Sequence, residues 1–428
     1  MKQVSHIAWL GKKTPFCGNV TYGLSTTEAL RERGYQISFI HFDNPISPGN
    51  SQTSLFANDP EVSLPYLVKS QVYTIPSPRA QRELRESLER LKPDLVHASL
   101  TLSPLDFRLP DLCQQIGVPL VATFHPPFDA GIRNLTAGTQ QLTYQLYAPS
   151  LARYDRVIVF SEMQAELLTK LGVKESRLAV IPNGVNTDIW KPDNQSSSSF
   201  KQKEVRKRLG KERVFLYMGR IATEKNVEAL LRAWRQIEPR GCRLVIVGDG
   251  PLRSTLEQSS LSTNDCDVLW WGYESDLETK LALLQCAEVF LLPSLVEGLS
   301  LSLLEAMATG TACVATDAGA DGEVLENGAG IVLSTQGVTT QLRTLLPVLR
   351  DQPVLTSELG RRARLRVLDR YTLPRNIDAI EELYAQLLNL NCQSIKQIKP
   401  VRDSFQQQEQ PLPLKPNVTL PSQDDVAQ

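Results

Sequence analysis

Short apolar runs alternate with amphipathic stretches along most of this chain. Each run is long enough for one buried strand, and each amphipathic stretch suits one helix. In the first half the pattern predicts strands at 4–10, 36–42, 94–99, 119–124, 157–160 and 178–182. It predicts helices near 22–33, 79–92, 138–153 and 162–171. This alternation is typical of βαβ units, which build a parallel sheet.

A second series of the same kind begins at residue 214. Its strands are predicted near 214–218, 243–247, 268–271, 288–292, 312–316 and 331–333, each followed by a stretch compatible with a helix. The segment from Lys191 to Ser199 is polar and rich in helix breakers, as in an interdomain linker. We therefore expect an α/β protein of two doubly wound domains with a cleft between them. The expected boundaries are 1–188, a linker at 189–212, and 213–372.

Composition narrows the class of protein. The chain has 428 residues, of which 42% are hydrophobic and 22% charged, which suits a soluble protein with two cores. A net charge of −1 gives no electrostatic case for binding nucleic acid. The seven cysteines show no CxxC spacing and indicate free thiols in a reducing cytosol, with no zinc site. No signal peptide or membrane-spanning run is predicted, so any membrane contact would be peripheral.

Two segments lie outside this α/β pattern. A basic cluster between Lys201 and Arg213 suits either anionic phospholipid or a solvated helix that leads into the second domain, and the helix is favoured. From 391 to 428 the chain is rich in Gln and Pro and lacks a periodic apolar face, which predicts a disordered tail.

Glu297 and Glu305 are the most informative pair of residues. They lie eight positions apart, the first in a glycine turn and the second in an apolar helix, so both can face one cleft. An acid at 305 needs a polar partner because leucines surround it in the sequence. A ligand with several hydroxyls would supply that partner, and so would a local Arg or a backbone amide.

Arg220 and Lys225 follow the strand at 214–218, close to the start of the next helix. Ligands of open α/β sheets bind beyond the carboxyl ends of strands. Two cations near a helix N-terminus suit a diphosphate, and they would stabilise a nucleotide leaving group without a metal. Ordinary surface charge is the alternative.

Strand ends in the first half add weaker candidates. Gly18 and Asn19 lie in a loop ahead of a helix, where amides can receive a phosphate or a sugar hydroxyl. His125 follows the strand at 119–124 and suits either a substrate hydroxyl or a structural role. His97 is placed similarly, but no other motif converges on it. The absence of GxGxxG and GxxxxGK[ST] argues against a dinucleotide site or an NTPase.

Three further features have ordinary explanations. The turn at 247–251 and the pair Trp270-Trp271 could each border a base pocket, although paired Trp is more often core. The one DxD, at 265–267, precedes its strand and indicates a turn, so no metal site is predicted.

These motifs together resemble the family 4 retaining glycosyltransferases, whose GT-B fold has two facing Rossmann-like domains. The resemblance covers roughly residues 1–390, and the segments that carry it are 181–186, 219–225, 247–251 and 297–308. It implies that a helix at 373–390 returns to the first domain. The first loop has Cys17-Gly18-Asn19 where many members carry adjacent glycines. The turn at 321–323 lacks a proline often found there, although Glu323 fits.

The resemblance also implies roles for individual residues. The diphosphate of a nucleotide sugar would be held by Arg220 and Lys225, the donor sugar by Glu297, and the ribose by Glu305, with His125 near the transferred sugar. The implied catalytic residues are His125, Glu297, Arg220 and Lys225. The implied donor-binding residues are Gly18, Asn19, Gly219, Arg220, Lys225, Gly298, Leu299, Ser300 and Glu305. No further cofactor is implied.

A narrower similarity lies in segments 6–22 and 97–107, which resemble the galactolipid-forming branch of this family in cyanobacteria. It implies a UDP-galactose donor, a monogalactosyldiacylglycerol acceptor and a cytoplasmic or peripheral location on the cytoplasmic face of a thylakoid or plasma membrane. Residues 64–68 and 100–107 would then hold acyl chains or belong to ordinary core. The alternatives are another donor such as GDP-mannose or UDP-glucose with a polysaccharide or small acceptor, and a non-catalytic nucleotide-sugar sensor. An oxidoreductase is disfavoured by the missing glycine fingerprint.

Overall fold

The computed structural model describes residues 5–14, 17–43, 60–70, 73–128, 135–193, 199–263 and 267–388. Three expectations lie wholly or partly outside these residues. They are the tail at 391–428, most of the linker's serine run, and Asp265-Cys266 of the DxD. Residues up to Leu388 form one compact unit.

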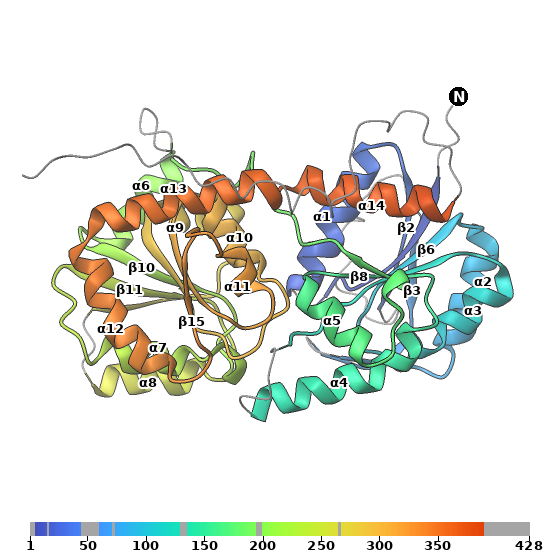
Figure 1. Ribbon diagram of the computed structural model, residues 1–428, viewed down its shortest axis with the longest axis horizontal. Coiled ribbons are helices and arrows are strands. Elements are labelled where there is room, and N and C mark those ends of the chain that lie inside the picture. Colours follow the sequence, from blue (N-terminus) through green and yellow to red (C-terminus); the bar gives the residue numbers. More distant parts are fainter. Residues whose placement is uncertain are drawn as a thin grey trace, which may run out of the picture. The chain divides into compact units, whose positions relative to one another are not determined.

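The first sheet of the described chain is entirely parallel, in the order β3-β2-β1-β6-β7-β8-β9 (Figure 1). Its strands are β1 (His6–Leu10), β2 (Gln36–Phe42), β3 (Glu61–Leu64), β6 (Leu95–Ser99), β7 (Leu120–Thr123), β8 (Arg156–Val159) and β9 (Leu178–Val180). The accompanying helices are α1 (Gly18–Glu32), α2 (Ala80–Leu91), α3 (Leu109–Ile116), α4 (Leu135–Leu151) and α5 (Glu162–Lys170). A separate antiparallel hairpin consists of β4 (Tyr66–Lys69) and β5 (Thr74–Pro76).

Both faces of the first sheet are covered, as the alternation along β1 shows. Ile7 and Trp9 belong to the core that contains residues of α1, whereas Ala8 and Leu10 pack with α2 and α3 on the other face. All four side chains are buried. Such double coverage explains why the strand reads as a continuous apolar run instead of an alternating one.

The second sheet is also parallel, in the order β12-β11-β10-β13-β14-β15. Its strands are β10 (Arg213–Met218), β11 (Cys242–Val247), β12 (Val268–Gly272), β13 (Ala287–Leu292), β14 (Ala312–Thr316) and β15 (Ile331–Leu333). Its helices are α6 (Phe200–Leu209), α7 (Val227–Trp234), α8 (Arg253–Ser262), α9 (Leu277–Cys286), α10 (Leu301–Ala308), α11 (Asp321–Val324), α12 (Val338–Asp351) and α13 (Pro353–Arg370). Every strand predicted from the sequence is present within about two residues of its predicted ends, and the α/β class is confirmed.

The last described helix, α14 (Leu373–Leu387), packs against α1 of the first sheet. Arg33, the C-cap of α1, forms ion pairs with Asp378 and Glu381 of α14. Deeper in, the Tyr384 hydroxyl lies 2.5 Å from Nδ1 of His97 on β6. The segment after α13 therefore contributes to the first core, while the exact domain boundaries remain a prediction.

None of the described helices combines the length and the apolar character that crossing a bilayer requires.

Candidate functional site

In each sheet there is one point where the order of strand addition reverses, and the candidate residues follow strands at that point. In the second sheet the order reverses between β10 and β13, which lie side by side. Arg220 and Lys225 follow β10, and Glu297 follows β13. Open α/β sheets bind ligands at such switch points, beyond the carboxyl ends of the strands. The topology therefore brings the cations and the first acid to one edge of the sheet.

Lys225 and Glu297 form an ion pair with 2.5 Å between Nζ and Oε1. The Ser294 hydroxyl donates a hydrogen bond to the same carboxylate oxygen at 2.7 Å. The Lys225 side chain is 23% exposed and that of Glu297 only 8%, so the pair is largely withdrawn from water. Lys225 thus supplies the charge that makes a buried Glu297 tolerable.

Arg220, five positions before Lys225 in the chain, is paired with Glu224. The buried Tyr217 fixes the local backbone, because its hydroxyl donates to the Arg220 carbonyl oxygen at 2.6 Å. Burial and the nearby carboxylates of Glu297 and Glu224 raise the pKa of Tyr217 well above its usual value, so its hydroxyl stays protonated. Each of the two cations expected to hold a diphosphate is therefore paired with an acid, Arg220 with Glu224 and Lys225 with Glu297.

The turn at 297–300 is held from two sides. The amide of Phe128, from the first half of the chain, donates to the Glu297 carbonyl at 2.8 Å. On the other side Gly319 has φ +59°, and a Cβ there would lie 2.1 Å from the same carbonyl oxygen, so only glycine fits. Among the described residues, the amides of Gly298 and Leu299 have no hydrogen-bond acceptor. These two amides precede α10 and form a candidate anion site.

The Ser300 amide, the third in this turn, already has an acceptor within the protein, and a role of Ser300 in donor binding stays a prediction. Its N–H donates to Oδ1 of Asp321 at 2.9 Å, while its side chain caps α10 by accepting from the Leu303 amide. Asp321 was missed in the sequence because no spacing connects it to the turn. The only signal was the unusual segment at 321–323.

Glu305 lies in α10, two turns further along. Burial raises its pKa to about 7, and the nearby Lys280 lowers it only in part. Within the described chain no hydrogen bond or ion pair joins its carboxyl to Lys225, Arg220 or the 297–300 turn. Its role in binding ribose stays a prediction.

His125 follows β7 and is linked by hydrogen bonds to Ser99 at the end of β6 and, through Ser99, to Asn19 of α1. Ser99 donates its hydroxyl proton to Oδ1 of Asn19 at 3.1 Å and lies 2.8 Å from Nε2 of His125. With its proton committed, Ser99 accepts from Nε2–H, which leaves the lone pair on Nδ1. Burial and the positive Lys12 lower the pKa of His125 to about 3, so the ring is neutral at physiological pH.

Gly18 and Asn19 lie in a helix and not in the loop predicted from the sequence. The sequence placed them in a loop ahead of a helix at 22–33, but α1 begins at Gly18 with Cys17 as its N-cap. Asn19 therefore lies in the first helical turn, where its side-chain amide also donates to the Leu100 carbonyl at 3.0 Å. This shift occurs because Val20 and Tyr22 are buried and extend the apolar face toward the N-terminus.

His125 and the 297–300 turn are neighbours. A Cβ on Gly298 would lie 3.3 Å from the His125 carbonyl oxygen, and the buried Asn183 donates its side-chain amide to the Leu299 carbonyl at 2.9 Å. Asn183 belongs to the 181–186 motif. The structure therefore gathers Lys225, Glu297, the 298–300 turn and His125, with Arg220 adjacent.

Both halves of the chain match known families. Residues 18–189 match the family described as Glycosyltransferase Family 4, and residues 212–350 match the one described as Glycosyl transferases group 1. The chain is a family 4 glycosyltransferase.

Individual relatives of this glycosyltransferase differ in their named sugars and acceptors. It is 28% identical over 219 residues to the alpha-monoglucosyldiacylglycerol synthase of Streptococcus pneumoniae, covering 48% of this chain and 47% of that protein. It is 25% identical over 317 residues to the UDP-Gal:alpha-D-GlcNAc-diphosphoundecaprenol alpha-1,3-galactosyltransferase of Escherichia coli, covering 71% and 78%. The aligned region spans about half the length of several curated relatives.

The fold agrees with that of solved glycosyltransferases. The crystal structure of HepE from Anabaena with UDP-glucose superposes with a TM-score of 0.72 at 17% identity, covering 89% of this chain and 99% of that chain. The expected GT-B architecture of two Rossmann-like domains is thereby confirmed.

Directly after β10 and β11 of the glycosyltransferase, Gly219 and Gly248 let the two strand ends approach each other closely. Gly248 has φ +136°, and a Cβ there would lie 1.9 Å from the Gly219 carbonyl oxygen. Gly219 in turn donates its amide to the Val247 carbonyl at 3.0 Å. Trp270 and Trp271 are half-buried and pack against the core, as expected for paired tryptophans.

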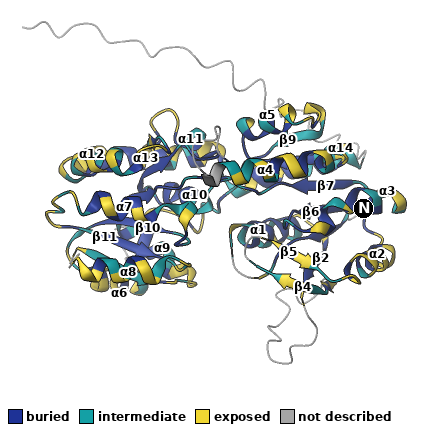
Figure 2. Ribbon diagram, turned by 90° about the horizontal axis from the view of Figure 1, so that it is seen from below, coloured by how far each residue is buried: buried dark blue, intermediate teal, exposed yellow. Residues whose placement is uncertain are grey.

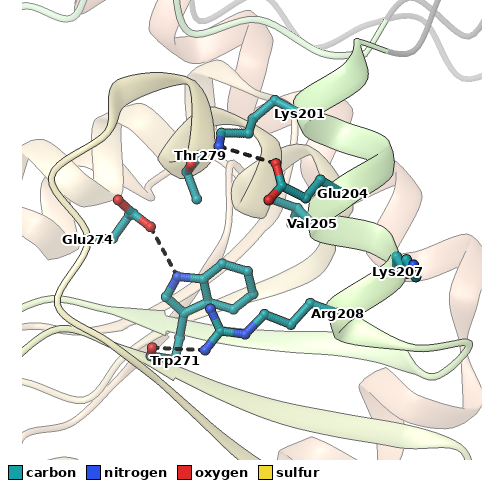
Figure 3. A pocket seen from close by; sticks show the side chains of 8 residues that line it. All are labelled: Lys201, Glu204, Val205, Lys207, Arg208, Trp271, Glu274 and Thr279. Atoms are coloured by element: carbon teal, nitrogen blue, oxygen red, sulfur yellow. Dashed lines mark hydrogen bonds and ion pairs between the residues drawn. The ribbon is translucent and has the colours of Figure 1, made fainter.

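A cavity of about 450 Å³ lies away from these residues, between α6, the end of β12 and α9 (Figure 3). Arg208 stacks 3.7 Å from the centre of the Trp271 ring, and Lys201 donates to Glu204 at 3.3 Å. Outside the cavity, Arg213 pairs with Glu288. These contacts give several members of the basic cluster partners within the protein, and none of the predicted site residues lines this cavity.

The segments at 64–68 and 100–107 contain both buried and exposed apolar side chains. Leu64, Leu100 and Leu105 are buried core. In contrast, Leu67 and Val68 on β4 are 65% and 45% exposed, and Tyr73 and Ile75 of the same hairpin are also exposed (Figure 2).

Among the described residues, no three His, Cys, Asp or Glu side chains converge as metal ligands.

Proposed function

We propose that this glycosyltransferase moves a hexose from a nucleotide sugar to an acceptor with retention of configuration and without a metal. The observation that carries the proposal is the Lys225–Glu297 ion pair beside the Gly298 and Leu299 amides, with Arg220 adjacent. Cations and free amides at one switch point suit the diphosphate of a donor. Glu297 would then be free to accept hydrogen bonds from the hydroxyls of the donor sugar.

The candidate set also limits the mechanism. Charge that develops on the departing diphosphate would be stabilised by Lys225, Arg220 and the two amides. His125 is neutral and accepts hydrogen bonds through Nδ1, so it suits a sugar hydroxyl better than a phosphate. None of these side chains is an obvious nucleophile. This fits a displacement on one face of the sugar, in which the departing phosphate accepts the acceptor's proton.

For the substrates, we propose UDP-galactose as donor and monogalactosyldiacylglycerol as acceptor, which makes the product digalactosyldiacylglycerol. The similarity of segments 6–22 and 97–107 to galactolipid-forming enzymes supports this choice. Two relatives support it in part, since one is named for a diacylglycerol glycolipid and the other for a UDP-galactose donor. The exposed apolar side chains of the β4–β5 hairpin suit a protein that meets a lipid surface at the cytoplasmic face of a membrane.

The test is a transfer assay with a matrix of labelled donors and acceptors. Purified protein is incubated with UDP-galactose, UDP-glucose or GDP-mannose and with vesicles that contain monogalactosyldiacylglycerol or diacylglycerol. We expect label in digalactosyldiacylglycerol from UDP-galactose only. Transfer from another donor would refute the substrate assignment and keep the enzyme class. Tight UDP-galactose binding with no turnover over hours would favour a sensor instead.

A further inference from the structure

Asp321 is a buried acid that the proposed mechanism does not use. It is 1% exposed, at the start of α11, and its Oδ1 accepts the Ser300 amide at 2.9 Å. Within the described chain its second oxygen, Oδ2, is buried and has no hydrogen-bond partner. A buried carboxylate with one unpaired oxygen is costly, whereas a buried carboxylic acid is much less so.

The charges around Asp321 act in the same direction. Glu297, from the loop after β13, is a second acid close by, and Lys225, from the loop after β10, is already paired with Glu297. Burial and Glu297 raise the pKa of Asp321 well above its usual value, and the Ser300 amide and Lys225 offset this only in part. One cation therefore faces two buried carboxyl groups, and the neutral form of Asp321 resolves the imbalance.

The contacts of Ala320 and Asp321 determine which backbone amides of the 297–300 turn remain for a ligand. Ala320, the N-cap of α11, donates its amide to the Gly298 carbonyl at 2.8 Å, so Ala320 and Asp321 hold the turn at Gly298 and at Ser300. With Ser300 engaged by Asp321, the amides of Gly298 and Leu299 have no acceptor in the part of the chain that the structure describes. An ionised Asp321 would place a second negative charge where a diphosphate must approach, and a neutral one does not.

We propose that Asp321 is a positioning residue for the donor. In its neutral form it binds the Ser300 amide, fixes the turn, and leaves Gly298 and Leu299 as the pair of amides that binds the donor diphosphate. This inference rests on the proposed function, because it assigns Asp321 to the donor side of that site.

The experiment compares Asp321→Asn, Asp321→Ala and, as a matched control, Glu323→Gln. Asn keeps an oxygen for the Ser300 amide and places an NH₂ where the acid proton would be. Ala removes both. Glu323 lies on the same helix, and burial raises its pKa to about 7, but among the described residues the groups that act on its carboxyl are Met163, Glu326, Glu162 and Arg366, none of them in the 297–300 turn. Donor KM, acceptor KM and UDP affinity are measured at pH 7 and pH 9, together with Tm from pH 5 to 8.

Asp321→Ala is expected to raise the donor KM and the Kd for UDP at least fivefold while the acceptor KM changes less than twofold. Asp321→Asn is expected to stay within threefold of the native donor KM at pH 7 and to lose less activity than the native protein at pH 9. Glu323→Gln should leave the donor KM unchanged. Equal donor KM values for Asp321→Asn and Asp321→Ala, or no change in either, would overturn the inference.

The Tm series tests the protonation state without any turnover. The folded pKa of Asp321 is raised, so the folded protein holds a proton that the unfolded chain releases above about pH 4. Stability is therefore lost as the pH rises, and Asp321→Asn removes this loss. Its Tm advantage over the native protein should grow from pH 5 to pH 8, and a constant difference contradicts neutrality. If UDP binds but no donor is turned over, the proposed function fails, and the UDP affinity of Asp321→Ala decides this inference alone.

Discussion

Replacing Lys225 with alanine tests two roles of its ammonium group, one in folding stability and one in catalysis, and each role predicts an effect of a different size. In the folded protein Lys225 neutralises Glu297, whose side chain is 8% exposed. Removing one partner of a fully buried ion pair costs about 3–5 kcal/mol. Lys225 is 23% exposed, so water would solvate part of the stranded carboxylate. We therefore expect a loss of about 2 kcal/mol of folding stability, a fall in Tm of a few degrees.

The second role is in catalysis. If Lys225 stabilises negative charge on the departing diphosphate, its loss removes a donor aimed at the transition state, which typically costs about 10²–10³ in rate. The assay is kcat/KM for the donor, with Tm measured on the same samples. Lys201→Ala is a matched control, because its exposed pair with Glu204 should contribute less than about 1 kcal/mol.

The double variant Lys225→Ala, Glu297→Gln distinguishes the two roles. Gln removes the stranded negative charge at nearly constant volume, so the Tm should recover most of its loss. Activity should stay low, since both the cation and the carboxylate assigned to the donor sugar are missing. The reasoning is refuted if Lys225→Ala retains kcat/KM within threefold of native, or if the double variant regains activity along with stability.

Substitutions at Gly319, Tyr384 and His125 test three further contacts. Gly319→Ala should lower Tm and kcat/KM together, because its Cβ would lie 2.1 Å from the Glu297 carbonyl oxygen. Gly337→Ala is the control: its φ is +69° and its Cβ would have no described atom within 4 Å, so it should cost only about 1 kcal/mol of folding free energy and leave activity unchanged. Equal effects of the two substitutions would contradict the close-approach argument. Tyr384→Phe leaves Nδ1 of buried His97 unpaired and should cost about 1–3 kcal/mol in thermal unfolding, and an unchanged Tm would show that the hydrogen bond contributes nothing. The pKa of His125 is lowered to about 3, so the stability that the neutral ring contributes is complete above about pH 6.5 and is lost as the pH falls toward 3. In His125→Gln the Tm should therefore fall less steeply between about pH 6.5 and 3 than in the native protein. The same dependence of Tm on pH in both proteins would contradict this assignment.

The strands were predictable because burial of both sheet faces produces continuous apolar runs that periodicity detects. Sequence reasoning failed at the β4–β5 hairpin, where strands of three or four residues expose Leu67 and Val68 and show no alternation. It also missed α3, since its eight residues follow a 3₁₀ turn and give only two helical turns of pattern. The spacing of apolar residues reveals burial only in helices and strands that are long enough for the spacing to repeat.

The site shows the same limit in another form. Lys225 was predicted from the end of a strand and Glu297 from its spacing to Glu305, and the strand order brings the two into contact. That the ends of β10 and β13 would be neighbours follows from the general behaviour of switch points. The capture of the Ser300 amide by Asp321 did not follow from any spacing, because it depends on how two turns fold against each other.

The hydrogen bond between His97 and Tyr384 joins residues 287 positions apart, which has a consequence for biosynthesis. At about 5–20 residues per second, the ribosome delivers Tyr384 roughly 15–60 s after His97. During that interval the nascent first sheet has no α14 to cover α1, and an apolar face stays open to chaperones and to other chains. We expect the newly made N-terminal half to be a chaperone client until translation passes residue 388, and a release at a stop codon before 373 to leave it permanently so.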